Sequence, residues 1–513
     1  MTLLNAPLYK KLKEHAAAKP VSFHVPGHRN GEALAELTVE TDYLLEALQT
    51  VMKLDVTELS STDDLHDPQG AIREAQQLAA KTFGAEHTFF LVGGSTSGNL
   101  AILLSVCDYD DIVIVQRNVH KSIINGLKLA GAKAVFVSPQ IDEQTGLATI
   151  PSVEAISQAL EAYPTAKAVF LTNPNYYGIG FKLNQWANAV HAYNIPLLID
   201  EAHGAHYSRH PELPTSALAA GADAVVQSTH KTLPALTMSA MLHIQGNRLN
   251  VHKIQQTLAM IESSSPSFPL LVSLDISRAM IDQAGQQLIE QSIRTANELR
   301  SWLQQRNGAI QAVQLDCHNK IEQLSNKSDC KQTDPLRVLL YDRTYANSGF
   351  ELQIMLEENN CWIEMSDAKY CVLIVSIGMG IDSIDPLKQA ITIIEEKIAC
   401  QVSQHTMNRS KQAEQLQNEG SWELTISKPV VFRRSLNTAQ VVISITLEDA
   451  EGFEAAEQII PYPPGIPLLY EGEKWTRSLI HQVSRLAKAG ARFQNASDAE
   501  MKTVLVYEKG PGV

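Results

Sequence analysis

Two residues that could do chemistry stand where apolar runs of this sequence end, and Lys231 is the first of them. Lys231 closes Gln227-Ser228-Thr229-His230-Lys231, directly after the run 223–226. A lysine amine at the end of a buried strand can hold a carbonyl compound as an imine. The neighbouring imidazole and hydroxyls suit a phosphorylated carbonyl compound. A solvated surface lysine is the alternative interpretation of so short a match.

Asp200 is the second such residue. It ends the apolar run 196–199 and opens Asp200-Glu201-Ala202-His203. A partly buried carboxylate without a cationic partner costs on the order of several kcal/mol. A protonated pyridine nitrogen is such a partner, and an aspartate on that nitrogen together with a lysine imine is how proteins bind pyridoxal phosphate. Helix capping, or a metal site with His203 and His206, are the alternatives. A metal would leave Lys231 unexplained, so no metal is expected.

A glycine turn supplies the third feature. The strand-like run 88–92 continues into Gly93-Gly94-Ser95-Thr96-Ser97-Gly98-Asn99, and a helical pattern covers 100–106. Backbone N–H groups at a helix N-terminus, with the hydroxyls of Ser95, Thr96 and Ser97, can bind a phosphate. The turn is not a P-loop, because the Gly-Lys-Ser/Thr ending is absent. A Gly-Ser turn that only caps the helix is the alternative.

The elements that would position these groups are short apolar strands alternating with helices. Strands are expected at 112–115, 134–137, 168–172 and 196–199, and helices at 71–83, 123–129 and 153–163. This alternation predicts a mostly parallel sheet with helices on both faces. His120 follows the strand 112–115, at the edge where open α/β sheets bind ligands. Strands at 338–341, 362–365 and 372–376 predict a smaller α+β domain after it.

Length and charge narrow the classes of protein. A chain of 513 residues exceeds one hydrophobic core, so we expect an N-terminal arm and loop at 1–50, a large domain at 51–318 and a C-terminal α+β domain at 319–513. The net charge of −14 argues against nucleic acid as a partner and suits a cationic small molecule. The six cysteines are widely spaced, and neither a signal peptide nor a membrane span is apparent. A cytoplasmic location is expected.

The ordered motifs carry a resemblance to a known family. Gly-Gly-Ser-Thr-Ser-Gly-Asn, Arg-Asn-Val-His-Lys-Ser, Asn-Pro-Asn-Tyr-Tyr-Gly, Asp-Glu-Ala-His-Gly-Ala-His and Ser-Thr-His-Lys occur here in the order seen in the ornithine/lysine/arginine decarboxylases. Phe-His-Val-Pro-Gly-His near the start and Pro-Tyr-Pro-Pro-Gly-Ile-Pro near the end also resemble that family. The similarity implies the aspartate-aminotransferase fold (fold type I). It is greatest to the shorter bacterial members that lack an N-terminal receiver-like domain.

The resemblance also implies roles for individual residues. Lys231 would carry the pyridoxal 5′-phosphate, Asp200 would pair with the pyridine nitrogen, and His120 would stack on the ring with His203 close by. The phosphate would be held by Ser95, Thr96, Ser97, Ser228 and His230. The loop 262–267 resembles one that reaches the neighbouring subunit's phosphate, which implies a homodimer or a higher homo-oligomer. Gly98 stands where some larger members carry a further hydroxyl.

The implied function is decarboxylation of a basic amino acid. Arginine, lysine or ornithine would lose CO₂ and give the amine for polyamine biosynthesis, with Lys231 or His230 protonating the α-carbon. Two other classes of activity stay open: an aminotransferase or β-eliminating lyase with the same cofactor, and a non-catalytic regulator that binds pyridoxal phosphate.

Overall fold

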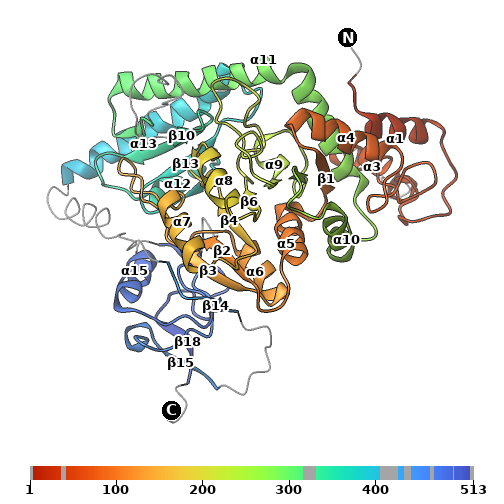
Figure 1. Cartoon of the computed structure of the whole chain (residues 1–513). Coiled ribbons are helices and arrows are strands. Elements are labelled where there is room, and N and C mark those ends of the chain that lie inside the picture. Colours follow the sequence, from red (N-terminus) through yellow and green to blue (C-terminus); the bar gives the residue numbers. More distant parts are fainter. Residues whose placement is uncertain are drawn as a thin grey trace. The chain divides into compact units, whose positions relative to one another are not determined.

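The computed structural model describes residues 4–35, 42–315, 331–404, 426–432, 441–462, 467–488 and 490–508 (Figure 1). The chain divides into two compact units. The first unit comprises Met1–Val106, Leu183–Pro211 and Thr215–Gln287, and the second comprises Cys107–Lys182, Glu212–Pro214 and Leu288–Val513.

The first unit holds four strands of a large sheet, in the order β1-β8-β7-β6. Their bounds are His87–Leu91 (β1), Leu197–Asp200 (β6), Ala224–Gln227 (β7) and Ala240–Ile244 (β8). All residues of β6, β7 and β8 are buried, because helices cover both faces of such a sheet. The pair β6 and β7 is parallel, as predicted. The strand β8 was not predicted, and it pairs antiparallel with both β1 and β7.

The helix after β1 begins earlier than its apolar pattern predicts. It spans Gly94–Val106 (α5), so the hydroxyl cluster 95–97 forms its first turn. The backbone of Gly94 has φ +73°, a conformation that glycine adopts without strain. A Cβ at Gly98 would lie 2.9 Å from atoms of both Leu91 and Val226. The close packing of α5 on the sheet therefore explains the glycine at 98, where a side chain with a hydroxyl would not fit.

The remaining helices of the first unit are predicted in part. The helix α1 (Pro7–Ala17) buries Leu8 and Leu12, and α4 (Ala71–Phe83) has the predicted bounds. A buried ion pair between Asp275 and Arg278, 2.6 Å apart, anchors α1, since the Asp275 carboxylate accepts the N–H of Leu8. The other helices are α2 (Glu32–Ala35), α3 (Tyr43–Met52), α8 (Asn184–His191), α9 (Thr229–Thr232), α10 (Val251–Ile261) and the start of α11 (Phe268–Arg306).

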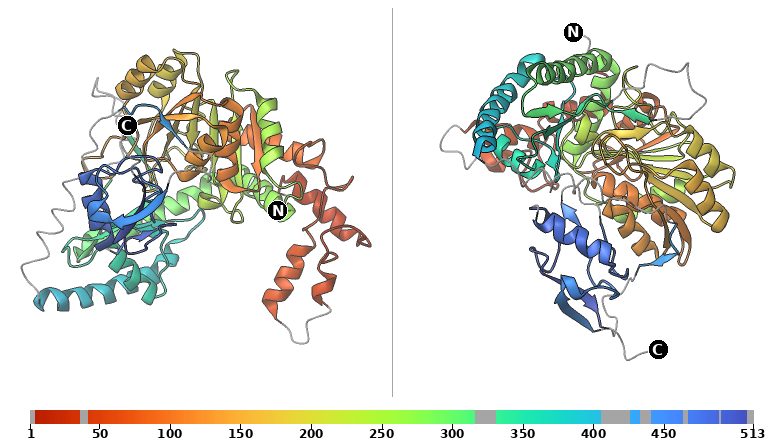
Figure 2. Two further views of the ribbon diagram at one scale, coloured as in Figure 1. Left: turned by 90° about the horizontal axis from the view of Figure 1, so that it is seen from below. Right: turned by 90° about the vertical axis from the view of Figure 1, so that its left-hand side faces the viewer.

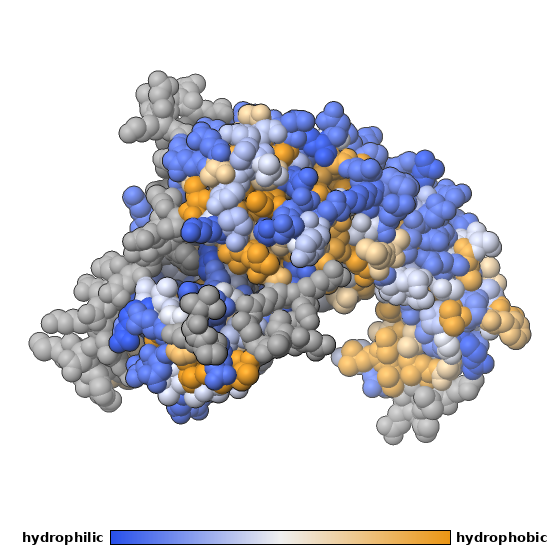
Figure 3. Space-filling view, turned by 60° about the horizontal axis from the view of Figure 1, so that its bottom comes forward, coloured by the Kyte–Doolittle hydropathy of each residue, from blue (hydrophilic) through white to orange (hydrophobic). Residues whose placement is uncertain are grey.

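An arm that carries α2 and α3 extends from the first unit (Figure 2, left, red-orange). It exposes large apolar side chains: Phe23 is 96% and Tyr43 is 76% accessible. Figure 3 shows hydrophobic residues gathered on it. We call this set of exposed side chains the apolar arm; it consists of Val21, Phe23, Val25, Tyr43, Leu44, Leu48 and Val51.

The second unit holds the other four strands of the large sheet, in the order β4-β2-β3-β14. They are Ile112–Gln116 (β2), Lys133–Val137 (β3), Ala168–Thr172 (β4) and Val430–Val431 (β14). The pairs β2–β3 and β2–β4 are parallel, and β14 pairs antiparallel with β3. The eight strands thus form one mixed sheet rather than a wholly parallel one. The helices α6 (Lys121–Ala130) and α7 (Val153–Ala162) occur close to their predicted positions.

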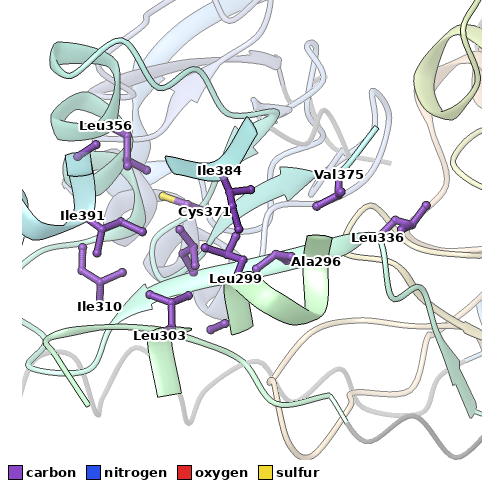
Figure 4. Packing of buried hydrophobic residues seen from close by; sticks show 14 of the residues in the cluster. Ala296, Leu299, Leu303, Ile310, Leu336, Leu356, Cys371, Val375, Ile384 and Ile391 are labelled. Atoms are coloured by element: carbon purple, nitrogen blue, oxygen red, sulfur yellow. The ribbon is translucent and has the colours of Figure 1, made fainter. Parts of the chain in front are cut away.

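A second, four-stranded sheet has the order β12-β13-β11-β9. Its strands are Ile310–Ala312 (β9), Arg337–Asp342 (β11), Met365–Ser366 (β12) and Cys371–Ile374 (β13). It packs with α11, α12 (Gly349–Glu358) and α13 (Asp385–Gln404) around an aliphatic core that includes Leu299, Leu356 and Ile391 (Figure 4). Of the strand predicted at 362–365, only Met365 lies in a strand, β12, so the prediction is wrong for residues 362–364. The Trp362 side chain is 77% exposed and does not join the core.

The C-terminal part of the second unit has its own core around the fully buried Trp475. Its elements are β15 (Val442–Thr446), β16 (Pro461–Tyr462), α15 (Arg477–Lys488), β17 (Arg492–Phe493) and β18 (Thr503–Tyr507), and a short pair of β5 (Ile179–Phe181) with β10 (Lys331–Thr333) lies elsewhere in the unit. The Arg117 guanidinium joins the C-terminal part to β2 through Glu473, at 2.5 and 2.7 Å. Its central carbon lies 4.9 Å from the ring centre of Phe136 and 5.1 Å from that of Tyr470, and these two rings stack on each other.

Several predicted boundaries fall outside the described residues. The start of the C-terminal domain at 319 lies within 316–330, so the predicted domains 1–50, 51–318 and 319–513 stay a prediction. Residues 463–466, most of the motif Pro-Tyr-Pro-Pro-Gly-Ile-Pro, also lie outside the described residues. Within the described ranges, the helices are all too short or too polar to cross a membrane.

Candidate active site

Lys231 lies in the short helix α9, directly after β7, and touches a histidine from another strand end. Its Nζ is 3.0 Å from Nε2 of His203, which follows β6. Because an ammonium group can only donate, His203 Nε2 accepts and the other ring nitrogen carries the proton. His203 is buried, whereas Lys231 remains partly accessible. The His203 ring therefore holds the Lys231 amine in a partly accessible position.

Asp200 ends β6 and is 3% exposed. Its Oδ1 accepts the N–H of Ala202 at 3.1 Å, and its Oδ2 accepts Nδ2 of Asn99, on α5, at 3.0 Å. Both donors are neutral, so they orient the carboxylate without cancelling its charge. A buried carboxylate held in this way suits a protonated nitrogen of a ligand, as the sequence predicts.

The hydroxyl of Ser228 is a buried polar atom with no hydrogen-bond partner among the described residues. Ser228 is completely buried and lies between β7 and Lys231. An unpaired buried hydroxyl costs about 1–3 kcal/mol, so an acceptor atom of a ligand at this position would be stabilising. A phosphate oxygen fits this requirement, and the residues present therefore fit pyridoxal phosphate.

His230 is held by the backbone. Its Nδ1 is 2.9 Å from the carbonyl oxygen of Ser239, and its own N–H donates to the same oxygen at 3.2 Å. A carbonyl can only accept, so Nδ1 carries the proton and the neutral ring has an unprotonated Nε2. In this form His230 can accept a hydrogen bond at Nε2 but has no proton to give there.

The glycine turn has an additional carboxylate attached to it. Oε1 of Glu262, the residue after α10, accepts the N–H of Val92 at 3.1 Å, the N–H of Gly93 at 2.9 Å and the hydroxyl of Ser97 at 2.7 Å. The Ser97 hydroxyl also lies 2.8 Å from the carbonyl oxygen of Gly94. Ser97 is thus engaged within the protein, whereas Ser95 and Thr96 occupy the first turn of α5.

His120 belongs to the second unit, where it precedes α6. Its Nδ1 accepts the backbone N–H of Ser122 at 3.2 Å and lies 2.8 Å from the Ser122 hydroxyl. This N-cap fixes the plane of the imidazole, and it leaves the proton of the neutral ring on Nε2. Its predicted stacking on the cofactor stays a prediction, as do the roles of the other predicted site residues.

A row of buried polar side chains crosses the first unit behind the strand ends. We call Glu201, Gln227, His243 and Thr88 the polar row. Oε2 of Glu201 accepts an N–H of the Gln227 amide at 2.7 Å, and Oε1 of Gln227 is 3.1 Å from Nε2 of His243. Nδ1 of His243 is 2.8 Å from the hydroxyl of Thr88. Burial raises the pKa of Glu201 to about 8 and lowers the pKa of His243 to about 3. The four residues belong to neighbouring strands or their ends, so the row ties β6, β7, β8 and β1 together.

Sequence reasoning missed three polar residues that shape the site: Asn99, His243 and Glu262. Asn99 offered a signal, since an amide inside the apolar run 98–104 needs a buried partner. Glu262 was noted only as the start of a loop. Its contacts with residues 92–97 join positions far apart in the sequence, which no local pattern shows.

The acidic loop near residue 63 has a structural role. The Asp63 carboxylate accepts the N–H groups of Gln69, Gly70 and Ile72, and it thereby caps α4. The Asp64 carboxylate accepts the N–H of His66. Across the described part of the chain, no group of three or more His, Cys, Asp or Glu side chains is arranged to hold a metal ion.

Comparisons with known proteins agree with this architecture. The solved structure of lysine decarboxylase A from Pseudomonas aeruginosa superposes with a TM-score of 0.79 at 21% identity, covering 98% of this chain and 81% of that one. This likeness defines the class: the fold is the fold type I of pyridoxal-phosphate enzymes, with a large mixed sheet, and the predicted fold class is confirmed.

The family follows from the sequence comparisons. The model of the Orn/Lys/Arg decarboxylase major domain matches residues 6–398, and that of the family's C-terminal domain matches 430–495. The chain is 37% identical to the Bacillus subtilis protein YaaO, over 98% of this chain and 99% of that one. It is 32% identical to the arginine decarboxylase of the same organism, over 99% of both. The chain belongs to the Orn/Lys/Arg decarboxylase family.

Membership of this family confirms two predictions. The protein is a decarboxylase, and its cofactor is pyridoxal 5′-phosphate. The cofactor supplies an electron sink for the pair released when a bond to the α-carbon of an amino acid breaks. The part left to the protein is to hold the cofactor, select the bond and deliver the proton.

Proposed function

We propose that this enzyme decarboxylates a basic amino acid, with arginine as the first candidate. Two relatives that match over nearly the whole chain support arginine: the proteins of Bacillus subtilis and Bacillus anthracis, 32% and 31% identical, are both named arginine decarboxylase. The lysine decarboxylase LdcA of Pseudomonas aeruginosa is 29% identical over 57% of this chain. Lysine and ornithine are therefore the second candidates.

The observation that carries the proposal is the geometry of the strand ends in the first unit. Lys231 would bind the cofactor carbonyl, the Asp200 carboxylate would hold the pyridine nitrogen protonated, and the unpaired Ser228 hydroxyl would donate to the phosphate. The backbone N–H groups and hydroxyls of Ser95 and Thr96 would complete the phosphate site. His120 would stack on the ring.

The reaction replaces a carboxylate by a proton. The bond between the α-carbon and the carboxyl group breaks, CO₂ leaves, and the α-carbon takes up one proton. Lys231 is the better proton donor of the two predicted candidates, because the backbone carbonyl of Ser239 fixes the proton of neutral His230 at Nδ1. His203 Nε2 would take part by holding the Lys231 amine 3.0 Å away.

The amine product would serve polyamine biosynthesis, and the enzyme would act in the cytoplasm as a homodimer or a larger homo-oligomer. The apolar arm supports a second copy of the chain as the partner: large side chains such as Phe23 and Tyr43 lie exposed on it. Exposed apolar patches of this kind mark protein interaction sites. Analytical ultracentrifugation of the wild type and of Phe23→Ser tests the assembly. The oligomer of the variant is expected to have the higher dissociation constant.

Separate assays with arginine, lysine and ornithine test the activity. We expect CO₂ and the corresponding amine in equal amounts, fastest with arginine. Lys231→Ala should lose about 10³-fold or more of the rate, since the amine that would hold the cofactor and deliver the proton is removed. Oxo acid formation without CO₂ would indicate an aminotransferase, and a coloured protein that gives no product from any amine would indicate a regulator.

A further inference from the structure

One oxygen of Glu262 connects three parts of the glycine turn. It accepts hydrogen bonds from the last residue before the turn, Val92, from Gly93 within it, and from the hydroxyl of Ser97 on the first turn of α5. The carboxylate is partly buried, and burial raises its pKa although these three donors oppose the shift. The His66 side chain bonds the next residue of the loop, with its Nε2 3.0 Å from the carbonyl oxygen of Ser263.

The position of this oxygen bears on anion binding. The first four N–H groups of an α-helix have no acceptor within the helix, and they bind a phosphate only when the chain enters the helix at a suitable angle. The Gly93 and Gly94 backbone that sets this angle is intrinsically pliable. The contacts of Glu262 on both sides of these glycines restrict it.

We propose that Glu262 is a positioning residue that holds the glycine turn in the shape required to bind the cofactor phosphate. The inference rests on the proposed function, in which Ser95 and Thr96 bind that phosphate. Ser97 then supports the turn through Glu262, instead of contacting the phosphate with its hydroxyl.

The role depends on the acceptor oxygen and not on the negative charge. A carboxylate near a phosphate is repelled by it, so charge at this position opposes cofactor binding. Glutamine presents an uncharged amide oxygen at the same place to Val92, Gly93 and Ser97. Glu262→Gln should therefore retain the function that Glu262→Ala loses.

The test compares two ligands that differ only in the phosphate. Cofactor-free protein is titrated with pyridoxal phosphate and with pyridoxal, and the visible absorbance gives both dissociation constants. Glu262→Ala is expected to weaken pyridoxal phosphate about tenfold and to leave pyridoxal within about twofold, because three donors lose their acceptor. Glu262→Gln should stay within about threefold of the wild type for both. Glu74→Ala, an exposed glutamate on α4, is the matched control.

Ser97→Ala gives a second, milder test that keeps both backbone contacts of Glu262. It should weaken pyridoxal phosphate about threefold, and Ser97→Ala with Glu262→Ala should be no weaker than Glu262→Ala alone. Circular dichroism checks that each variant is folded, and if Glu262→Ala is not, the Ser97 and Gln variants decide.

Three results would overturn the role of Glu262: equal losses for both ligands, a Gln variant as weak as the Ala variant, or no change in Ser97→Ala. If the wild type develops no visible band with either ligand, the proposed function itself fails, and that outcome is distinct.

Discussion

The core of the four-stranded sheet and the strand ends of the first unit are both buried, yet they are built from opposite materials. The first consists of aliphatic side chains such as Leu299, Leu356 and Ile391, each almost inaccessible to solvent (Figure 4). The second buries Asp200, Glu201 and His243 beside a hydroxyl that lacks a partner among the described residues. Burial of apolar surface stabilises the first region, whereas the second keeps polar groups that disfavour folding and favour a ligand. Substitutions should therefore separate stability from cofactor chemistry.

Asp200→Asn should have the largest effect on activity with the least effect on folding. An asparagine cannot hold the pyridine nitrogen in its protonated form, so kcat/KM should fall about 10³-fold. The free energy of unfolding should stay the same or rise, because a buried charge is removed. Steady-state kinetics and urea unfolding measure the two quantities. An activity within tenfold of the wild type would contradict the assignment of Asp200.

Leu299→Ala should do the reverse. Deleting a leucine that is 1% exposed in a packed core costs about 2–5 kcal/mol of unfolding free energy. The dissociation constant of pyridoxal phosphate should not change, since Leu299 lies in the aliphatic core of the second unit. Urea unfolding and absorbance titration of the same preparation test both statements. A parallel loss of cofactor affinity would show that the two regions are coupled.

Glu201→Gln should change how stability depends on pH. The folded-state pKa of about 8 lies above the usual 4.5, so folded Glu201 keeps a proton that the unfolded chain releases. The contribution of Glu201 to the free energy of unfolding is intact below pH 4.5. It falls by on the order of a few kcal/mol as the pH rises to about 8. Glutamine does not titrate and therefore removes this dependence on pH. The polar row can accommodate it, because the amide of Gln227 and the imidazole of His243 can reverse the direction of their hydrogen bonds.

Unfolding in urea at several values between pH 5 and 8 tests the polar row. His243 has a lowered pKa and acts in the opposite sense below pH 6.5, in the variant and the wild type alike. The difference between the two proteins therefore isolates Glu201. A constant difference across this range would exclude a raised pKa.

Ser228→Ala should have the smallest effect. It should raise the stability of the cofactor-free protein and lower its affinity for pyridoxal phosphate. The cofactor-free protein should be about 1 kcal/mol more stable, because the buried unpaired hydroxyl is gone. Pyridoxal phosphate should bind about tenfold more weakly, because one phosphate contact is lost. Thermal unfolding with and without cofactor reports both. If the cofactor-free variant is less stable than the wild type, the Ser228 hydroxyl is hydrogen-bonded in the cofactor-free protein, and the interpretation is wrong.

Local patterns predicted much of the fold. The bounds of α4 and β4 match the predicted 71–83 and 168–172, since their apolar spacing is regular and their ends are marked. The pattern failed for α5, whose first turn Gly94-Ser95-Thr96-Ser97 is made of poor helix formers; tertiary contacts of α5 compensate, namely the hydrogen bond from Ser97 to Glu262 and the close packing of Gly98 on Leu91 and Val226. It also missed β8, which gave no alternating signal because it is buried on both faces.

Of the candidate site, the sequence predicted only the residues that directly follow strands. Lys231 and Asp200 each follow an apolar run, and the sheet brings their strands β7 and β6 side by side. The contacts of Asn99 with Asp200 and of Glu262 with Ser97 arise from helices that pack on the sheet, over 101 and 165 residues of sequence. Such contacts follow from tertiary packing, which a single sequence does not display.

The apolar arm has a consequence for how output would scale with expression. If a second chain covers Phe23 and its neighbours and also completes the cofactor site, as the resemblance of the loop 262–267 implies, each molecule becomes active only after meeting another, and the active fraction rises with total concentration. Doubling the gene dose in a sparsely expressing cell would then more than double amine production. In highly diluted assays, the specific rate would decline with every further dilution step.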